Sequence, residues 1–232
     1  MKLWWLLFFP TLCIADTRDM TIGEKYLGKP YVLDPLGEEK LPDTDPLIRF
    51  DAFDCTTFVE TVLADGDVQK LNKIRYKDGK VHFMTRNHFI ETEWLPNNSD
   101  IVENVSAKYG KTAIREITIN RAAWMKRVHN VLDSTPNKTV KLEYIPYENL
   151  GKIKTKKPLI VLFAFNGDPK IIEKTGTDLS VHHMGFLLPD GTFRHASSSG
   201  GGVVDIKFDE YVAKRKIMPN NIGIVLLGIK QK

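Results

Sequence analysis

The chain has 232 residues, of which 42% are hydrophobic and 27% charged, and its formal net charge is +4. This composition excludes a disordered or fibrous protein and predicts one globular domain with a sizeable core. The positive charge is mild and spread along the chain without a basic stripe, which excludes nucleic acid as an expected partner but suits anionic ligands.

The first predicted element is a secretory signal peptide over residues 1–15. One lysine precedes an apolar run, and Cys13 and Ala15 follow in a small-x-small arrangement. The run is short for a bilayer span, which takes about 20 apolar residues. We expect cleavage after Ala15 and a periplasmic or secreted single domain, 16–232, with no stable membrane association. Lipidation of Cys13 and an uncleaved anchor are the alternatives.

A helix that begins at Cys55 is predicted next, in FDCTTFVETVLA (residues 53–64). Asp54 is placed as its N-cap, and apolar residues recur after Cys55 at helical spacing. Without the signal peptide Cys55 has no second cysteine to pair with, so it is either a buried small side chain or a reactive group. Its place in the first helical turn predicts a lowered pKa and a thiolate.

The stretch that follows this helix, about 66–150, is longer than a compact helix-and-sheet core needs and indicates an insertion. Within it Arg86, His88 and Trp94 combine charge, imidazole and aromatic surface, which suits a groove for a sugar and a peptide. The alternative for this segment is a solvated hairpin anchored by the tryptophan. A core-packing helix is predicted over 121–134, with His129 on its surface.

The chemistry-bearing block is LSVHHMGFLLPDGTFRHASSSGGGVVD, residues 179–205. Its pattern predicts three strands, over 181–188, over 192–196 and near Val203. Side chains alternate along a strand, so only one of His182 and His183 can face the cysteine helix. His195 on the second strand can reach and orient that imidazole. Nucleophile, base and orienting group form the arrangement that thiol hydrolases use.

Three further elements complete the predicted core. Continuous apolar runs predict buried strands over 157–165 and 222–229, and a short helix is expected over 208–216.

Four strings together resemble the NlpC-type, papain-like superfamily of bacterial cell-wall amidases and peptidases: LGKPY (27–31), FDCTTFVE (53–60), HMGFLL (183–188) and FRHAS (193–197). The resemblance implies an α+β fold in which the cysteine-bearing helix packs on an antiparallel β-sheet, with a large insertion between the Cys helix and the His strands. It also implies that Cys55 is the nucleophile, His183 the base, His195 the orienting group and Tyr31 a hydroxyl beside the thiol. His182 is left without a role.

A narrower resemblance rests on DCTTFVE, on IRYKDGKVHFMTRNHFIETEW (74–94) and on TDLSVHHMG. The chain is similar there to the N-acetylmuramoyl-L-alanine amidase-like family, over about residues 24–228. The resemblance implies an enzyme that cuts the amide between muramic acid, in its 1,6-anhydro form, and L-alanine in peptidoglycan fragments. We expect it to be a monomer without cofactor or metal. The substrate-binding residues we expect are Tyr31, Asp54, Arg86, His88 and Trp94.

Several alternative functions stay open at this stage. A cysteine peptidase that cuts within the stem peptide would use the same catalytic residues. A metal site of His182, His183 and His195 would need a bend or bulge, and no known ligand spacing supports it. A wall-binding domain without catalysis and a serine hydrolase built on residues 197–199 are the remaining candidates.

Overall fold

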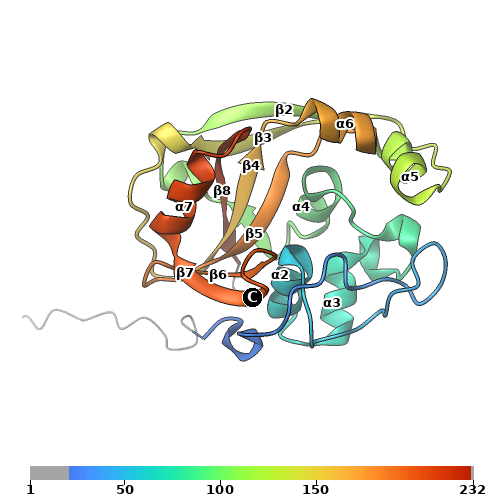
Figure 1. Cartoon of the computed structure of the whole chain (residues 1–232), viewed down its shortest axis with the longest axis horizontal. Helices are drawn as coiled ribbons and strands as arrows, with labels where there is room; N and C mark the ends of the chain where they lie inside the picture. The colour runs from blue at the N-terminus through green and yellow to red at the C-terminus, as the bar shows by residue number, and fades with distance from the viewer. Residues whose placement is uncertain (1–20, 231–232) are drawn as a thin grey trace, which may run out of the picture.

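The structure is a computed structural model that describes residues 21–230, so the predicted signal peptide lies outside the described residues. The chain forms a mixed α+β fold built around one antiparallel sheet, as Figure 1 shows. In the described part of the chain, no helix is both long enough and apolar enough to cross a membrane.

Eight strands make the sheet, and all of their pairings are antiparallel. Their order is β2-β3-β8-β4-β5-β6-β7, with β1 added beside β8. The strands are β1 (Val102–Asn104), β2 (Ala113–Ile119), β3 (Lys138–Pro146), β4 (Leu159–Phe165), β5 (Val181–Leu187), β6 (Thr192–Ser197), β7 (Gly202–Lys207) and β8 (Asn221–Ile229).

The helices lie around this sheet and at its ends (Figure 1). They are α2 (Cys55–Leu63), α3 (Val68–Arg75), α4 (Leu95–Asn97), α5 (Arg121–His129), α6 (Pro169–Thr175) and α7 (Phe208–Lys216). Short 3-10 turns occur at Glu24–Tyr26, Lys77–Gly79, Phe83–Thr85, Ser106–Lys108 and Tyr147–Asn149, and a π-helical turn at Ile90–Trp94.

The two faces of the sheet carry separate cores. On one face, Met184 and Phe186 of β5 pack with Phe58 of α2 in a cluster of fully buried side chains. On the other face, Leu187 of β5 and Phe163 of β4 pack with Phe208 of α7. Alternation along β5 explains the separation, because neighbouring side chains leave a strand on opposite sides. The helices α2 and α7 thus lie on opposite sides of the central strands (Figure 1).

The structure confirms the expected strands and the short C-terminal helix. They could be predicted because continuous apolar runs and turn residues mark them in the sequence. The helix predicted over 121–134 ends early, at His129, since Asn130 takes a left-handed conformation with φ 55° and closes the helix. The alternative of a solvated hairpin within 81–94 is not seen in the described structure. Helical turns at Phe83–Thr85 and Ile90–Trp94 are joined there by irregular backbone, and Arg86 forms an isolated antiparallel bridge with Tyr76.

Part of the stretch predicted as an insertion, namely β1, β2 and β3, joins the main sheet. β3 pairs with β8 through Ile145 and Ile224, and β2 pairs with β3 along its whole length. The segment therefore widens the same sheet that carries the histidine strands.

Candidate active site

The cysteine helix begins where the sequence predicts it to begin. Asp54 has extended backbone angles, and its Oδ1 accepts hydrogen bonds from the Thr57 backbone N–H at 2.8 Å and from the Thr57 hydroxyl at 2.7 Å. The Thr57 hydroxyl in turn accepts from the Asp54 backbone N–H at 3.0 Å, which completes a capping box. Asp54 Oδ2 accepts from the Asp34 backbone N–H at 3.3 Å. The cap fixes Cys55 as the first residue of α2.

The thiol of Cys55 lies against the backbone of β5. Its Sγ is 3.9 Å from the Thr56 hydroxyl, and the Met184 backbone N–H also bonds to it. That N–H is available because β5 and β6 pair only between 186 and 194 and between 187 and 193, so the two strands separate before Met184. The start of α2 is therefore positioned where the sheet opens.

His183 and His195 form a hydrogen-bonded pair beside this opening. His183 Nε2 lies 2.7 Å from His195 Nδ1, and their rings are nearly perpendicular at 88°. Tyr211 of α7 contacts both rings, with centroids 5.7 Å from His183 and 4.8 Å from His195, and Phe193 stacks on His195 at 4.7 Å. These contacts hold both imidazoles in fixed orientations.

Gly185 makes room for this pair. A Cβ added at Gly185 would stand 2.7 Å from His195 Cβ, from the Arg194 carbonyl oxygen and from Phe193 Cζ. Any side chain at this position would push β6 away, and with it the ring that bonds His183. The His-x-Gly spacing of the sequence thus has a packing cause, since the glycine lies two residues along the same face as His183.

The protonation of the site differs from the sequence-based expectation. Burial raises the pKa of the Cys55 thiol to about 11, and the neighbouring Asp54 carboxylate raises it as well. Hydrogen bonds from the Met184 N–H, the Thr56 hydroxyl and the Cys55 N–H act in the opposite direction and do not offset these two effects. Burial lowers the pKa of His183 well below its ordinary range and that of His195 to about 4. The resting site therefore holds a neutral thiol and neutral imidazoles, not the predicted thiolate.

Among the described residues, Cys55 makes no hydrogen bond to His183. The two side chains approach from different sides of the sheet: the residues of β5 that face α2 are Met184 and Phe186, whereas His183 lies with Phe163 and Tyr211. Tyr211 links the two parts of the site: it contacts both histidine rings, and it lies close enough to Cys55 for that group, in addition to burial, to raise the pKa of Tyr211. Catalytic hydrogen bonds are often long in the absence of substrate and tighten when it binds.

A bulge gives His182 a place of its own. β4 pairs Phe163 with His183 and Ala164 with Val181, so His182 is an extra residue in the ladder. Its ring stacks on Phe165 at 3.6 Å, and its Nε2 is buried without a hydrogen-bond partner. Despite this bulge, the part of the chain that the structure describes contains no cluster of side chains suited to hold a metal ion.

Tyr31 lies close to Cys55. It pairs with Phe53 in a bridge just before the cysteine helix. Burial raises the pKa of Tyr31 to about 12, with further contributions from the nearby Cys55 and Asp54. The hydroxyl therefore stays protonated at neutral pH and can donate a hydrogen bond at the site.

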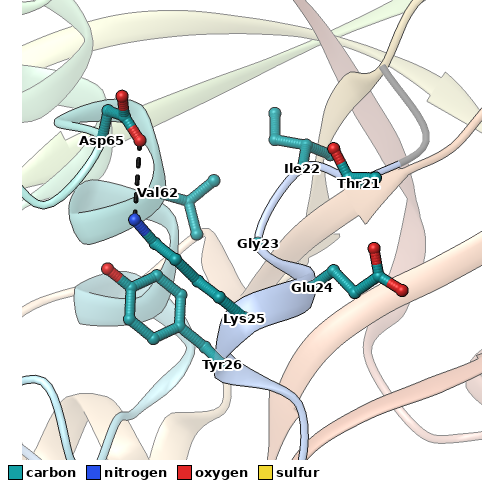
Figure 2. Close-up of a pocket in the computed structure, with 8 residues that line it drawn as sticks. All are labelled: Thr21, Ile22, Gly23, Glu24, Lys25, Tyr26, Val62 and Asp65. Atoms are coloured by element: carbon teal, nitrogen blue, oxygen red, sulfur yellow. Dashed lines mark ion pairs between the residues drawn. The ribbon is translucent and has the colours of Figure 1, made fainter. Parts of the chain in front are cut away.

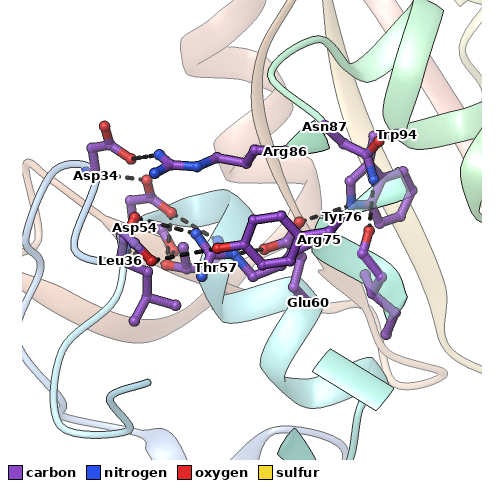
Figure 3. A network of polar contacts seen from close by, with 12 residues as sticks. Asp34, Leu36, Asp54, Thr57, Glu60, Arg75, Tyr76, Arg86, Asn87 and Trp94 are labelled. Carbon is purple, nitrogen blue, oxygen red and sulfur yellow. Dashed lines mark hydrogen bonds and ion pairs between the residues drawn. The ribbon is translucent and has the colours of Figure 1, made fainter. Parts of the chain in front are cut away.

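Arg86, one of the expected substrate contacts, is buried in a network of acidic side chains, shown in part in Figure 3. It forms a two-pronged ion pair with Glu38 and lies 2.7 Å from Asp43 and 3.6 Å from Asp34. The Tyr76 hydroxyl donates to the same Glu38. The network fastens the segment around 34–43 next to the cap of α2, a structural role that leaves no free guanidinium for a substrate.

Trp94 and His88 are likewise occupied within the fold. Trp94 is 0% exposed, and its indole N–H donates to Glu60 of α2 at 3.0 Å. Glu60 also forms an ion pair with Arg75 at 3.3 Å (Figure 3). Through Glu60, both Trp94 and Arg75 anchor the cysteine helix to neighbouring segments. His88 Nε2 bonds the Phe83 carbonyl, and burial lowers its pKa well below its ordinary range. The placement argues against direct substrate contact for both.

His129 differs from the prediction too, because its ring is half-buried. It packs on Trp124 at 4.6 Å and on Phe83 at 4.9 Å.

A cavity of about 650 Å³, seen in Figure 2, lies away from the cysteine and the histidines: it is bounded by residues 21–26 and by Val62 and Asp65 at the far end of α2 from Cys55. It contains none of the predicted site residues.

Sequence reasoning missed the contribution of α7. Tyr211 contacts both histidines, and Arg215 lies over the Tyr211 ring with its guanidinium carbon 5.6 Å from the ring centroid. The two residues are four apart, and that spacing puts them on one face of a helix. The spacing alone predicts that Tyr211 and Arg215 share a helix face, but it does not indicate that this face packs against the histidines.

A cysteine at a capped helix start, beside a pair of bonded histidines on an antiparallel sheet, has the parts of a thiol hydrolase. Residues 21–222 match the model of the N-acetylmuramoyl-L-alanine amidase-like family. The chain belongs to this family, which confirms the resemblance that the sequence motifs predict.

Solved structures share the fold. A Legionella pneumophila protein superposes with a TM-score of 0.82 at 24% identity, covering 93% of this chain and 89% of its own. An N-acetylmuramoyl-L-alanine amidase from Bacteroides uniformis gives a TM-score of 0.72, also at 24% identity, covering 92% of this chain and 98% of its own. No curated protein matched the chain.

Proposed function

We propose that the protein is a cysteine-dependent N-acetylmuramoyl-L-alanine amidase acting on peptidoglycan fragments, with the 1,6-anhydro form of muramic acid as its preferred sugar. The observation that carries the proposal is that Tyr211 lies close to the Cys55 thiol and also touches both rings of the hydrogen-bonded His183–His195 pair. Family membership supports the amidase class, and the thiol mechanism and the substrate form are our inference from the site.

His183 starts the reaction as a general base. Its lowered pKa keeps the imidazole neutral, so it can take the proton from the neutral Cys55 thiol as the sulfur attacks the lactyl carbonyl carbon. His195 holds the other ring nitrogen and so fixes the orientation of the base. A carbon–sulfur bond forms and the carbonyl becomes an oxyanion.

The oxyanion needs hydrogen-bond donors at the start of α2. The backbone N–H of Cys55 faces its own sulfur and, in the described structure, has no carbonyl partner. The Tyr31 hydroxyl, kept protonated by its raised pKa, is a second donor in the neighbourhood. Fixed donors of this kind stabilise the charge that develops in the transition state.

Collapse of the intermediate breaks the carbon–nitrogen bond. The imidazolium of His183 gives its proton to the departing amine, which leaves as the free amino group of L-alanine. Water, deprotonated by the same imidazole, then attacks the thioester and releases the lactyl carboxylic acid and the Cys55 thiol. The cycle consumes one water molecule and needs no cofactor.

We further propose that the core is of the papain-like, NlpC type and that the protein acts in the periplasm or outside the cell. The core assignment is supported by the packing of α2 on β5 and by the order of Cys55, His183 and His195 along the chain. Export rests on the signal-like sequence of residues 1–15.

The test is mass spectrometry of an anhydro-muropeptide incubated with the mature protein and with Cys55→Ala. A free stem peptide that begins with L-alanine, seen only with the intact thiol, is the expected result. A shortened peptide still attached to the sugar would make the protein a peptidase. If the folded protein gives no product, the result would favour a wall-binding domain without catalysis.

A further inference from the structure

Arg215 of α7 is a half-buried cation beside the histidine pair without an acidic partner in the described structure. Its guanidinium carbon lies 5.4 Å from the Phe163 ring centroid and 5.6 Å from that of Tyr211. Its one polar contact is a weak 3.9 Å hydrogen bond from Nη1 to Met218 Sδ, and its Nε is buried with no hydrogen-bond partner.

This arrangement is unlike that of the buried arginines. Each of those pairs with a carboxylate: Arg75 with Glu60, Arg86 with Glu38, Arg121 with Asp133, and Arg194 with Asp205. A buried nitrogen donor left without an acceptor costs roughly 1–3 kcal/mol. Arg75 also leaves one buried nitrogen, Nη1, without an acceptor, but its charge is paired with Glu60. Arg215 has no carboxylate partner in the described structure, which indicates that an anion arrives from outside.

The position of Arg215 relates that acceptor to the reaction. Tyr211, on which the guanidinium stacks, touches the rings of both His183 and His195. Phe163, the other ring under the guanidinium, lies 6.0 Å from His183. The positive charge is also close enough to lower the pKa of both imidazoles. An anion bound at Arg215 therefore sits next to the catalytic base.

The chemistry of a muropeptide tells which part of it carries that anion. The lactyl carboxyl of muramic acid is consumed in the scissile amide, so the sugar side has no free acid, whereas the peptide side keeps the carboxylates of its later residues. We propose that Arg215 binds a carboxylate of the stem peptide close to L-alanine, and so selects acidic peptides on the leaving-group side. The inference rests on the proposed function and names its substrate class.

A guanidinium suits this role because its planar fork bonds a carboxylate through two parallel N–H groups. The bound carboxylate would supply the charge partner that Arg215 lacks in the described structure. Lysine keeps the charge but not the fork, so Arg215→Lys retains part of the selectivity and Arg215→Gln retains none.

The test compares 1,6-anhydro-N-acetylmuramoyl-L-alanyl-D-glutamate with the same compound in which both glutamate carboxyls are primary amides. Arg215→Gln is expected to lower kcat/KM for the acid by roughly ten- to a hundred-fold and for the diamide by less than about two-fold. Lys214→Gln removes an exposed charge from the same helix and leaves both values unchanged. Equal losses on both substrates would mean that Arg215 only supports Tyr211 and the histidines, and would overturn the inference.

A binding measurement separates this inference from the proposed function. Calorimetry with L-alanyl-D-glutamate and with its diamide reports recognition of the carboxylate without any bond cleavage. Preference for the acid that Arg215→Gln abolishes supports the inference even if the wild type cleaves neither muropeptide, in which case the amidase proposal alone fails. Equal binding of the acid by wild type and Arg215→Gln overturns it.

Discussion

Replacing Gly185 by alanine tests whether this glycine is what allows His195 to bond His183. The added Cβ would lie 2.7 Å from three atoms, one of which is the backbone oxygen of Arg194 and cannot rotate away. Overpacking of this kind costs about 1–3 kcal/mol of folding free energy. Because relief requires β6 to move, the 2.7 Å contact between the two imidazoles should be lost with it.

The assay combines urea unfolding with the rate of amide cleavage. We expect Gly185→Ala to unfold at lower urea and, under conditions where it remains folded, to lose activity. Gly151→Ala is the matched control, since no atom lies within 4 Å of its added Cβ and its backbone needs no left-handed angle. If Gly185→Ala matches Gly151→Ala in both stability and rate, the packing argument for the His-x-Gly spacing is refuted.

Three further predictions concern protonation and the buried network. The rate of Cys55 alkylation by iodoacetamide should rise with pH toward a midpoint near 11. Asp54→Asn keeps the helix cap but removes the charge, so it should lower that midpoint. A wild-type midpoint below about 8.5 would instead reveal a preformed thiolate. The pH profile of kcat/KM should keep its acid limb below pH 6.5, because activity is lost only as His183 is protonated at its lowered pKa; a limb centred above 6.5 contradicts this. Arg86→Gln should lower the free energy of unfolding by about 3–5 kcal/mol in urea, because it leaves Glu38 buried without its cation. The control Arg49→Gln breaks an exposed ion pair and should cost less than about 1 kcal/mol. Equal costs would refute the structural role of Arg86.

The local sequence predicted the elements that bear the chemistry well. Asp54 before Cys55 marks the helix start because a carboxylate there satisfies free backbone amides. The strand of His183 and the strand of His195 follow from their apolar alternation and the turn between them, and the 2.7 Å contact of the two rings confirms that they meet.

What the sequence could not predict depends on long-range packing. The bulge at His182 arises from the pairing of β5 with β4, and nothing in the sequence of β5 indicates it. Burial of the thiol beside Asp54 raises its pKa, whereas its place at a helix start predicts a lowered one, and burial is a property of the whole fold. Arg86 and Trp94 have the residue types of a binding groove, but their partners Glu38 and Glu60 lie far away in the sequence.

The central claim is that Cys55 carries the acyl half of a muropeptide as a thioester during cleavage of the lactyl–alanine amide. The most direct measurement is the mass of the protein after a single turnover on an anhydro-muropeptide, stopped by rapid acid quench and followed by peptide mapping. The account predicts an adduct of the anhydro-muramoyl group alone, without amino acids, on the peptide that holds Cys55. An adduct that retains part of the stem peptide, or turnover with no adduct on Cys55, would contradict it.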